Sequence, residues 1–462
     1  MSTPKAPTKK SPMLIVITAL MLFSMFFGAG NLIFPPMLGA QAGENFLPAI
    51  LGFLGTGVLL PVLAVIAIAL SGNNVRDLAR RGGWLFGLVF PVLAYLSIGA
   101  FYALPRTGAV SYSTAIQPVL GTEGILASGI FNLIFFGIAF ALAYNPNSIV
   151  NNLGKFLTPV LLVLLVLLVV LAMINFDGVP GSPDAKYTEA PFPTGLVEGY
   201  LTMDSIAALA FGIIVISALR YKGMPEGKPL VRGTIAAGLV AGALLAVIYV
   251  GLGFIGQYIP DPGQYEDGAG LLADAALLIM GTPGQLVFGL IVLLACLTTA
   301  VGLIASTSEF FETLLPGIQY KVWAVIFSLM SFALATLGLD TVLAIAAPVI
   351  GFLYPSAITL IFITLIQPLF RGRVRFHWTY RVAIWVAVAW AALMTFNSLG
   401  WGTSAIEPLI AWSPMHSVEM GWVLPTLIGL VIGLVIDIVR PAPGAEQTPD
   451  AAVREPQEQV EA

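Results

Sequence analysis

Three polar interruptions lie inside long apolar runs of this chain, and each places groups there that could bind an ion or a small charged molecule. The first is Gly28-Ala29-Gly30-Asn31, inside the run FFGAGNLIFPP. Glycine costs about 1 kcal/mol in a helix and permits unusual dihedral angles, so a helix is predicted to break there. A broken helix offers free amides to an anion such as a carboxylate, and free carbonyls to a cation. The alternative is that these small residues let two helices pack closely.

The second interruption is GYLTMDSIAALAFG, which places Asp204 between apolar segments. A carboxylate in the middle of a membrane costs about 2.5–3.5 kcal/mol on insertion scales, so an acid at that depth indicates a function. Thr202 and Ser205 add polar groups that can satisfy a second broken helix. In the alternative interpretation, Asp204 lies near the outer interface and water solvates it.

The third interruption is the pair Thr298 and Thr299 within LLACLTTAVG. A threonine hydroxyl in a helix usually bonds a carbonyl of its own helix. If the two hydroxyls face a broken helix, they could instead give two hard oxygen ligands to Na⁺. Cys296 fits a small apolar filler, and Glu309 and Glu312 are expected at the solvated inner end of this span.

Composition identifies the elements that must position these groups. The chain has 462 residues, of which 58% are hydrophobic and 10% charged, against about 45–50% and 25% in soluble proteins. The chain is therefore predicted to be an integral membrane protein. A net charge of −4 gives no indication of nucleic-acid binding, and a single cysteine excludes a disulfide framework.

No catalytic pattern was found in the sequence. There is no P-loop, no HExxH motif, no pair of catalytic carboxylates and no serine triad signature. The two histidines, His377 and His416, are far apart and have no neighbours at metal-ligand spacing. The chain is therefore not expected to be an enzyme.

Twelve apolar runs are long enough to cross about 30 Å of hydrocarbon, so the expected fold is all-α. A segment of residues 1–12 precedes them, and a proline- and acid-rich tail of residues 440–462 is predicted to be disordered. The possible signal-peptidase site Ala40-Gln41-Ala42 is rejected because the apolar run before it exceeds an ordinary signal peptide. The predicted spans are residues 13–40, 47–70, 84–104, 124–143, 156–174, 195–219, 231–256, 284–308, 322–338, 341–369, 379–399 and 421–439.

The positions of the basic residues predict the orientation. With the N-terminus inside, 18 of the 20 lysines and arginines fall on the inner side, and only Arg106 and Lys186 remain for the outer side. Positive charge marks cytoplasmic loops, so both termini are predicted to be cytoplasmic.

The two interrupted spans are the first and the sixth, five helices apart. Secondary transporters are often built from inverted repeats whose discontinuous first helices meet at mid-membrane. Residues 13–174 and 195–369 would then form the two repeats, with residues 379–439 appended as two further helices.

The motifs FFGAGNLIFPPMLG, GYLTMDSIAALAFG and NNLGKFLTP together resemble the branched-chain amino acid:cation symporter family. The resemblance covers nearly all of residues 13–440. It implies a LeuT-like core of five plus five helices with two extra helices, within the amino acid/polyamine/organocation superfamily. It also implies uptake of leucine, isoleucine and valine across the bacterial inner membrane, coupled to Na⁺. No obligate protein partner is evident from the sequence.

The same resemblance implies a substrate site and a sodium site. The substrate residues would be Gly28, Ala29, Gly30, Asn31, Tyr200, Thr202 and Asp204. The amides near Ala29 and Gly30 would receive the substrate carboxylate, while Asp204 could be an ammonium partner, an ion ligand or a gate. The sodium ligands would be the carbonyls of Ser24, Phe27 and Ala295 and the hydroxyls of Thr298 and Thr299.

Other functions remain open on the sequence alone. Transport could instead be coupled to H⁺, with Asp204 or Glu309 as the proton carrier. The chain could also be a passive channel, or a membrane sensor that binds an amino acid without moving it.

Overall fold

The computed structural model describes residues 11–440 with the exception of residues 73, 122–123, 203 and 371–373. The described residues form helices and connecting loops, with no β-strand among them. The α-helices are α1 (Ser11–Phe26), α2 (Phe34–Ala42), α3 (Phe46–Leu54), α4 (Leu60–Ser71), α5 (Val75–Ala79), α6 (Trp84–Leu96), α7 (Ala103–Val110), α8 (Gln117–Leu120), α9 (Ile125–Ala143), α10 (Ile149–Asn151), α11 (Thr158–Asn175), α12 (Ala185–Glu189), α13 (Pro191–Leu201), α14 (Asp204–Tyr221), α15 (Lys228–Tyr258), α16 (Gly268–Met280), α17 (Thr282–Leu314), α18 (Tyr320–Thr336), α19 (Leu339–Ile366), α20 (Trp378–Ser398), α21 (Thr403–Ile410) and α22 (Val423–Val439).

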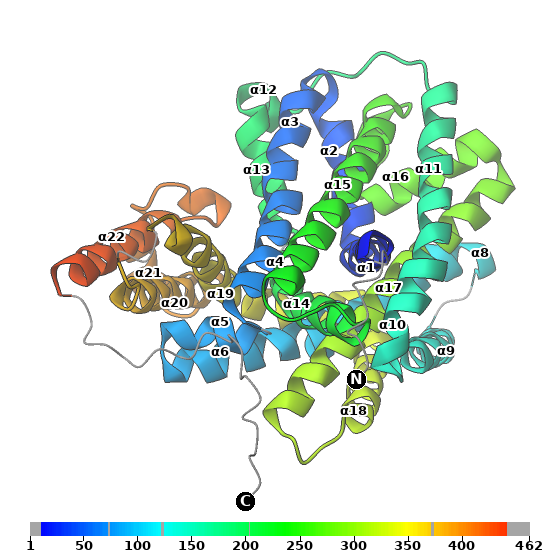
Figure 1. Cartoon of the computed structure of the whole chain (residues 1–462). Coiled ribbons are helices and arrows are strands. Elements are labelled where there is room, and N and C mark those ends of the chain that lie inside the picture. The colour runs from blue at the N-terminus through cyan, green and yellow to red at the C-terminus, as the bar shows by residue number, and fades with distance from the viewer. Residues whose placement is uncertain (1–10, 73, 122–123, 203, 371–373, 441–462) are drawn as a thin grey trace, which may run out of the picture.

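The predicted all-α membrane fold is confirmed. Each of the twelve predicted spans coincides with one helix or with a pair of consecutive helices. Within the described part of the chain, nine helical segments are long and apolar enough to cross a membrane, and four shorter apolar helices accompany them. Figure 1 shows α3, α4, α11 and α15 running obliquely past α1, which is seen nearly end-on.

The first span is discontinuous, as predicted. The helix α1 ends at Phe26, and Gly28 adopts an extended conformation with φ −108° and ψ −166°. A single short turn, Ala29–Leu32, then leads to α2. Pro35 and Pro36 lie in the first turn of α2, where a missing amide hydrogen costs no helical hydrogen bond.

The sixth span is also discontinuous. Its two helices are α13, which ends at Leu201, and α14, which begins at Asp204. The acidic side chain at the start of α14 suits the positive end of that helix dipole. Residue 203, between the two helices, lies outside the described residues.

Glycine contacts hold the second half of the first span, α2, against α15. A Cβ atom added to Gly39 would lie 1.9 Å from the Gly253 carbonyl oxygen, and one added to Gly256 would lie 1.8 Å from the Pro36 carbonyl oxygen. Only glycine allows two helix backbones to approach this closely. The short α16 also packs against this segment, with Gly268 beside the Ile33 carbonyl.

The third span is longer than predicted, and a charged residue that was predicted in a connection therefore lies inside a helix. After α6, a π-helical turn at Ser97–Phe101 and a bend at Tyr102 lead into α7. The apolar helical segment therefore extends over Trp84–Ile116. Arg106, predicted in the outer connection, lies inside α7. The predicted span ends at residue 104, but the proline at position 105 is compatible with the first turn of a new helix.

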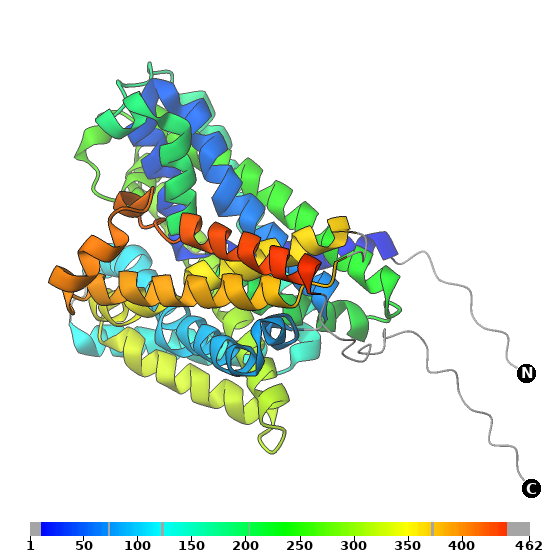
Figure 2. The same cartoon turned by 90° about the vertical axis from the view of Figure 1, so that its left-hand side faces the viewer.

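The helices after α19 form a group at one side of the molecule, seen in Figure 1 and face-on in Figure 2. Asp437 of α22 fixes the start of α20, accepting hydrogen bonds from the backbone amides of His377, Trp378 and Thr379, each at 2.9 Å. The Thr379 hydroxyl donates a fourth, at 2.7 Å. The carboxylate thus satisfies amides that the first turn of a helix leaves unpaired.

Candidate functional site

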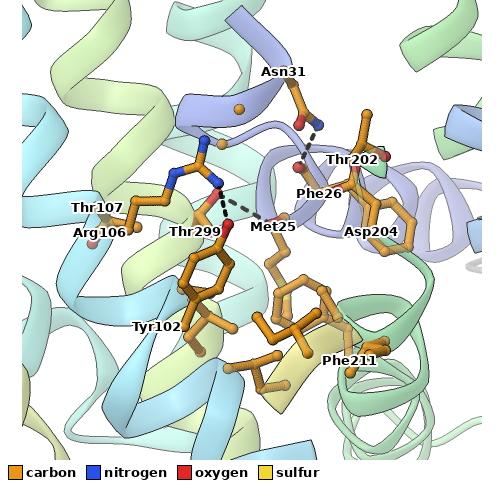
Figure 3. Close-up of a pocket in the computed structure, with 18 residues that line it drawn as sticks. Met25, Phe26, Asn31, Tyr102, Arg106, Thr107, Thr202, Asp204, Phe211 and Thr299 are labelled. Carbon is orange, nitrogen blue, oxygen red and sulfur yellow. Dashed lines mark hydrogen bonds between the residues drawn. The ribbon is translucent and has the colours of Figure 1, made fainter. Parts of the chain in front are cut away.

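A cavity lies where the interruptions of the first and sixth spans meet (Figure 3). It has about 80 Å³ of space, several times the roughly 10–15 Å³ that one water molecule requires. Its walls come from five parts of the chain that are far apart in sequence. They are Met25, Phe26, Gly28, Gly30 and Asn31; Ile98, Tyr102, Ala103, Arg106 and Thr107; Thr202, Asp204, Ile206, Ala207 and Phe211; Thr299 and Leu303; and Ile350.

Asn31 ties the two parts of the broken first span together. Its side-chain amide donates to the Phe26 carbonyl at 2.8 Å and to the Tyr249 hydroxyl of α15. The Phe26 carbonyl, at the end of α1, also accepts a hydrogen bond from the Gly28 amide at 2.9 Å. Asn31 is buried, and it stabilises the break from within the cavity wall.

Gly28 and Gly30 both line the cavity. A Cβ atom on Gly28 would lie 3.1 Å from the Thr299 hydroxyl oxygen, and one on Gly30 would lie 3.5 Å from Arg106 Nη2. The glycines therefore leave room for these two side chains beside the backbone. The backbone of Ala29 lies in the turn between them, and its side chain is outside what the structure describes.

Arg106 is a site residue that the sequence interpretation missed. Its Nη1 donates to the Tyr102 hydroxyl one helical turn earlier, at 2.9 Å, and its buried Nε has no hydrogen-bond partner among the described residues. The distribution of basic residues among the predicted connections places Arg106 in a connection on the outer side of the membrane. The spacing of Tyr102 and Arg106, four residues apart on one helix face, could have indicated a helix instead.

Asp204 lies across the cavity from Arg106 (Figure 3). Its carboxylate contacts the side chains of Thr202 and Asn31 and faces the positive charge of Arg106. The Thr202 hydroxyl also donates to the Gly199 carbonyl at 2.8 Å. Ser205, in contrast, is turned away and accepts a hydrogen bond from Tyr354 at 3.4 Å.

Oxygen atoms of α1 and α17 gather beside the cavity. The hydroxyl of Thr298 lies 2.9 Å from the Ser24 carbonyl oxygen and 3.1 Å from that of Ala295. The hydroxyl of Thr299 lies 3.3 Å from the Ser24 carbonyl oxygen and 3.1 Å from that of Met25. The structure thus brings together four of the five predicted sodium ligands and adds Met25.

Phe27 is the remaining predicted ligand, and its carbonyl is not among the hydrogen-bond acceptors of either threonine hydroxyl within the described residues. Its backbone amide donates to Phe23 at 2.8 Å, and its ring stacks on that of Phe23. Across the described residues, no group of three histidines, cysteines or carboxylates could hold a metal ion. The groups that surround the hydroxyls of Thr298 and Thr299 are backbone carbonyls.

Tyr200 does not line the cavity. Its ring packs against Tyr354, with 4.8 Å between ring centroids, and its hydroxyl accepts a hydrogen bond from Trp422 at 2.9 Å. It faces a separate apolar cavity bordered by α22. The side chain therefore connects the sixth span to the C-terminal helices rather than to the charged cavity.

A second polar cavity lies further along α17. Glu309 accepts a hydrogen bond from Ser217 there, and Glu312 accepts one from the Tyr320 amide at 2.9 Å. Both acids line this cavity. Cys296 is completely buried in α17, as expected for an apolar filler.

Comparison with known proteins reveals extensive similarity. The sequence profile of a family described as "Branched-chain amino acid transport protein" matches residues 11–440. The chain is 58% identical to the branched-chain amino acid permease BrnQ of Corynebacterium glutamicum, covering 93% of this chain and 96% of the relative. It is 39% identical to the BrnQ permease of Bacillus subtilis, covering 94% and 98%.

Solved structures show a similar fold at low sequence identity. Mhp1, a nucleobase-cation-symport-1 family transporter in a closed conformation with bromovinylhydantoin bound, aligns with a TM-score of 0.59 at 16% identity and covers 91% of both chains. A manganese transporter mutant of Eremococcus coleocola aligns with a TM-score of 0.51 at 16% identity and covers 95% of this chain and 98% of that one. These likenesses concern the LeuT-like fold alone.

The profile match and the identities extend over nearly the whole chain, including both interrupted spans that form the cavity. The protein is a membrane transporter, and it belongs to the branched-chain amino acid transport family.

Proposed function

We propose that this protein imports leucine, isoleucine and valine together with Na⁺ by alternating access. The observation that carries the proposal is the meeting of two broken helices at a cavity with fixed charges and a cluster of neutral oxygen atoms beside it. Transporters use discontinuous helices of this kind to bind substrate and coupling ion at mid-membrane. The printed names of the relatives, branched-chain amino acid permeases, support the substrate class.

The oxygen cluster supports Na⁺ as the coupling ion. Hard cations prefer carbonyl and hydroxyl oxygen atoms to nitrogen and sulfur, and Ser24, Met25 and Ala295 offer carbonyls near the two threonine hydroxyls. Na⁺ bound there would hold α1 against α17. It would favour one orientation of the transporter before the substrate binds.

The apolar part of the cavity supports branched aliphatic side chains. Phe211, Leu303 and Ile350 contribute to its lining. One methylene group gives only about 1–3 kcal/mol of discrimination in such a pocket. The three branched-chain amino acids should therefore be separated poorly from one another and well from polar amino acids.

Gradient-driven uptake tests this proposal. Purified protein reconstituted into lipid vesicles should accumulate leucine above the external concentration only when Na⁺ is higher outside. Vesicles with equal Na⁺ on both sides, and vesicles without protein, are the controls. Each of the twenty amino acids is then added as a competitor to define the substrate range.

The same assay separates the rival functions. Equal accumulation from a proton gradient alone would contradict sodium coupling and favour Asp204 or Glu309 as a proton carrier. Uptake that never exceeds equilibrium would indicate a channel, and leucine binding without any uptake would indicate a sensor.

We also propose that the protein lies in the bacterial inner membrane with both termini in the cytoplasm. The excess of lysine and arginine in the connections assigned to the inner side supports this orientation. Residues 13–174 and 195–369 would form the two inverted repeats, with residues 1–12 as a cytoplasmic segment before them. Chemical labelling of single cysteines placed in the connections, from outside intact cells, tests the orientation.

A further inference from the structure

Two side chains of opposite charge face each other across the cavity without forming an ion pair. Arg106 comes from α7 and Asp204 from the start of α14, and Figure 3 shows them on opposite sides of the cavity. Among the described residues, no carboxylate lies within 4.0 Å of the Arg106 guanidinium. The space between the two charges belongs to the cavity itself.

Among the described residues, each of the two charges has neutral groups as its direct partners. Arg106 donates to the Tyr102 hydroxyl and keeps its buried Nε without a partner. Asp204 contacts the neutral side chains of Thr202 and Asn31. A charge inside a membrane protein is costly unless an opposite charge compensates it. Both residues are therefore placed where a ligand carrying two opposite charges would stabilise them.

We propose that Arg106 binds the carboxylate of an α-amino acid and that Asp204 binds its ammonium group. This assignment rests on the proposed function and specifies how the substrate backbone is held. The guanidinium can donate two parallel hydrogen bonds to a carboxylate, a geometry that a lysine cannot provide. Arg106 thus joins the backbone at Gly30, beside which it lies, in receiving the carboxylate.

The arrangement also sets the direction of the side chain. The two polar groups of the amino acid lie on one carbon, so both must stay at the level of Arg106 and Asp204. Figure 3 shows Phe211 on the side of the cavity away from Asn31 and from the break in the first span. The aliphatic side chain would point toward that apolar side, which Leu303 and Ile350 complete.

The proposal predicts a selectivity that hydrophobic contacts cannot provide. A site that bonds both charges should reject an analogue lacking either one, because a charged protein group then loses its counter-ion. Leucinamide keeps the ammonium but lacks the carboxylate, whereas 4-methyl-2-oxopentanoate keeps the carboxylate but lacks the ammonium. These two compounds report on the two ends of the site separately.

The test measures equilibrium binding to purified protein at saturating Na⁺, by competition with radiolabelled leucine. In Arg106→Gln, the Kd for leucine should rise about ten- to hundredfold, while the Kd for leucinamide should change less than about threefold. In Asp204→Asn, the Kd for leucine should rise by a similar factor, while the Kd for 4-methyl-2-oxopentanoate should change little. Lys186→Gln, which removes an equal charge from the partly exposed pair with Glu198, should change none of these constants.

In the expected result, each variant loses affinity for leucine but not for the analogue that lacks the matching charge. A purely structural role of either residue would not produce this pattern. If Arg106→Gln weakens leucine and leucinamide equally, or leaves leucine binding intact, the assignment of Arg106 is overturned. Equal weakening of leucine and 4-methyl-2-oxopentanoate in Asp204→Asn would overturn that of Asp204. If Arg106→Gln does not fold, Arg106→Lys replaces it. The affinity for leucine must then fall more than the affinity for leucinamide, and an equal fall again overturns the proposal.

Failure of this inference is distinguishable from failure of the proposed function. Wild-type protein that accumulates leucine with Na⁺, combined with an Arg106→Gln variant of unchanged leucine affinity, leaves the transport function intact and removes only the charge assignment. Wild-type protein that shows no Na⁺-driven accumulation contradicts the transport function, whatever the variants bind.

Discussion

Two side-chain hydroxyls of α17, beside the cavity, form hydrogen bonds to the first span. The hydroxyls of Thr298 and Thr299 lie within 3.3 Å of the Ser24 carbonyl oxygen. Thr298 is also 2.9 Å from the carbonyl of Leu294, as threonines in helices commonly are. The contacts with α1 distinguish this pair, because they join two helices through atoms suited to a cation.

Removal of both hydroxyls should weaken the response to Na⁺ without unfolding the protein. In Thr298→Ala combined with Thr299→Ala, the Na⁺ concentration for half-maximal leucine uptake should rise about tenfold or more, since each hydrogen-bonding group contributes roughly 1 kcal/mol. Thr298→Ser keeps the hydroxyl and should stay near wild type. Uptake is measured over a series of Na⁺ concentrations.

The matched control is Thr234→Ala. Thr234 is fully buried, as Thr298 is, but among the described residues its hydroxyl bonds only the Leu230 carbonyl of its own helix. This variant should leave the Na⁺ dependence unchanged. A double threonine variant with wild-type Na⁺ activation would refute the ion site.

At the scale of elements, the geometry of the break in the first span depends on how its second half, α2, is held. The helix α2 packs against α15 through Gly39, Gly253 and Gly256, and through backbone contacts that leave no room for a Cβ atom. Asn31 adds a hydrogen bond from the turn to Tyr249 on the same helix. Because α15 fixes α2, the position of the broken turn relative to α17 is fixed as well.

Substitution at this contact should separate α2 from α15. In Gly256→Ala, the new methyl carbon would lie 1.8 Å from the Pro36 carbonyl oxygen, so one of the two helices must move. The expected result is a Tm several degrees lower and reduced leucine uptake. Both are measured on protein in the same detergent and lipid.

Gly137→Ala serves as the comparison for this helix contact. Gly137 lies in α9 with nothing within 4 Å of its added Cβ. Alanine favours a helix over glycine by about 1 kcal/mol, so the Tm should stay unchanged or rise. A Gly256→Ala variant as stable as Gly137→Ala would show that the close contact is not needed.

At the scale of the whole molecule, polar contacts join the helices after α19 to the core and to one another. The Trp422 indole donates to the Tyr200 hydroxyl, and Asp437 accepts four hydrogen bonds from the start of α20. The first contact reaches α13, next to the break in the sixth span. The second holds α20 and α22 together as one unit.

Loss of the Asp437 carboxylate should destabilise this unit and leave the cavity unchanged. Asp437→Ala leaves three backbone amides at the start of α20 without their acceptor. The free energy of unfolding should fall by about 2 kcal/mol or more, given the size of capping interactions and of hydrogen bonds to charged groups. The Tm should fall, while the KM for leucine of the folded protein stays near wild type. Glu266→Ala, at an exposed acid, should alter neither quantity. A large rise in KM for Asp437→Ala would show that these helices act on the site.

Much of the architecture could be predicted because it follows from local pattern. A run of about twenty apolar residues must be a helix in lipid, where every backbone polar group needs an internal partner. The two helix breaks were also visible, at Gly28 and at Asp204, since glycines and a carboxylate oppose a continuous apolar helix. Thr298 and Thr299 were identifiable as a hydroxyl pair for the same reason.

The remaining site residues depended on which side chains face each other in three dimensions. Arg106 was assigned to a loop from its charge, although α7 continues past it and carries it into the cavity. Tyr200 lies beside the break in sequence, yet packing against Tyr354 and Trp422 turns it away. Met25 gives a carbonyl near Thr299 that no residue pattern indicates, because every residue has a carbonyl.

The sequence by itself thus determined that the chain crosses a membrane, where its helices lie and where two of them are interrupted. Those properties follow from hydrophobic length and from the cost of glycine and charge inside lipid. Only the tertiary structure decided that α7 places Arg106 opposite Asp204, with a cavity between them. The physical reason is that Arg106 and Asp204 are about a hundred residues apart in sequence, so only the packing of their helices brings them to one cavity. That packing also determines that the two charges face the cavity instead of pairing with each other.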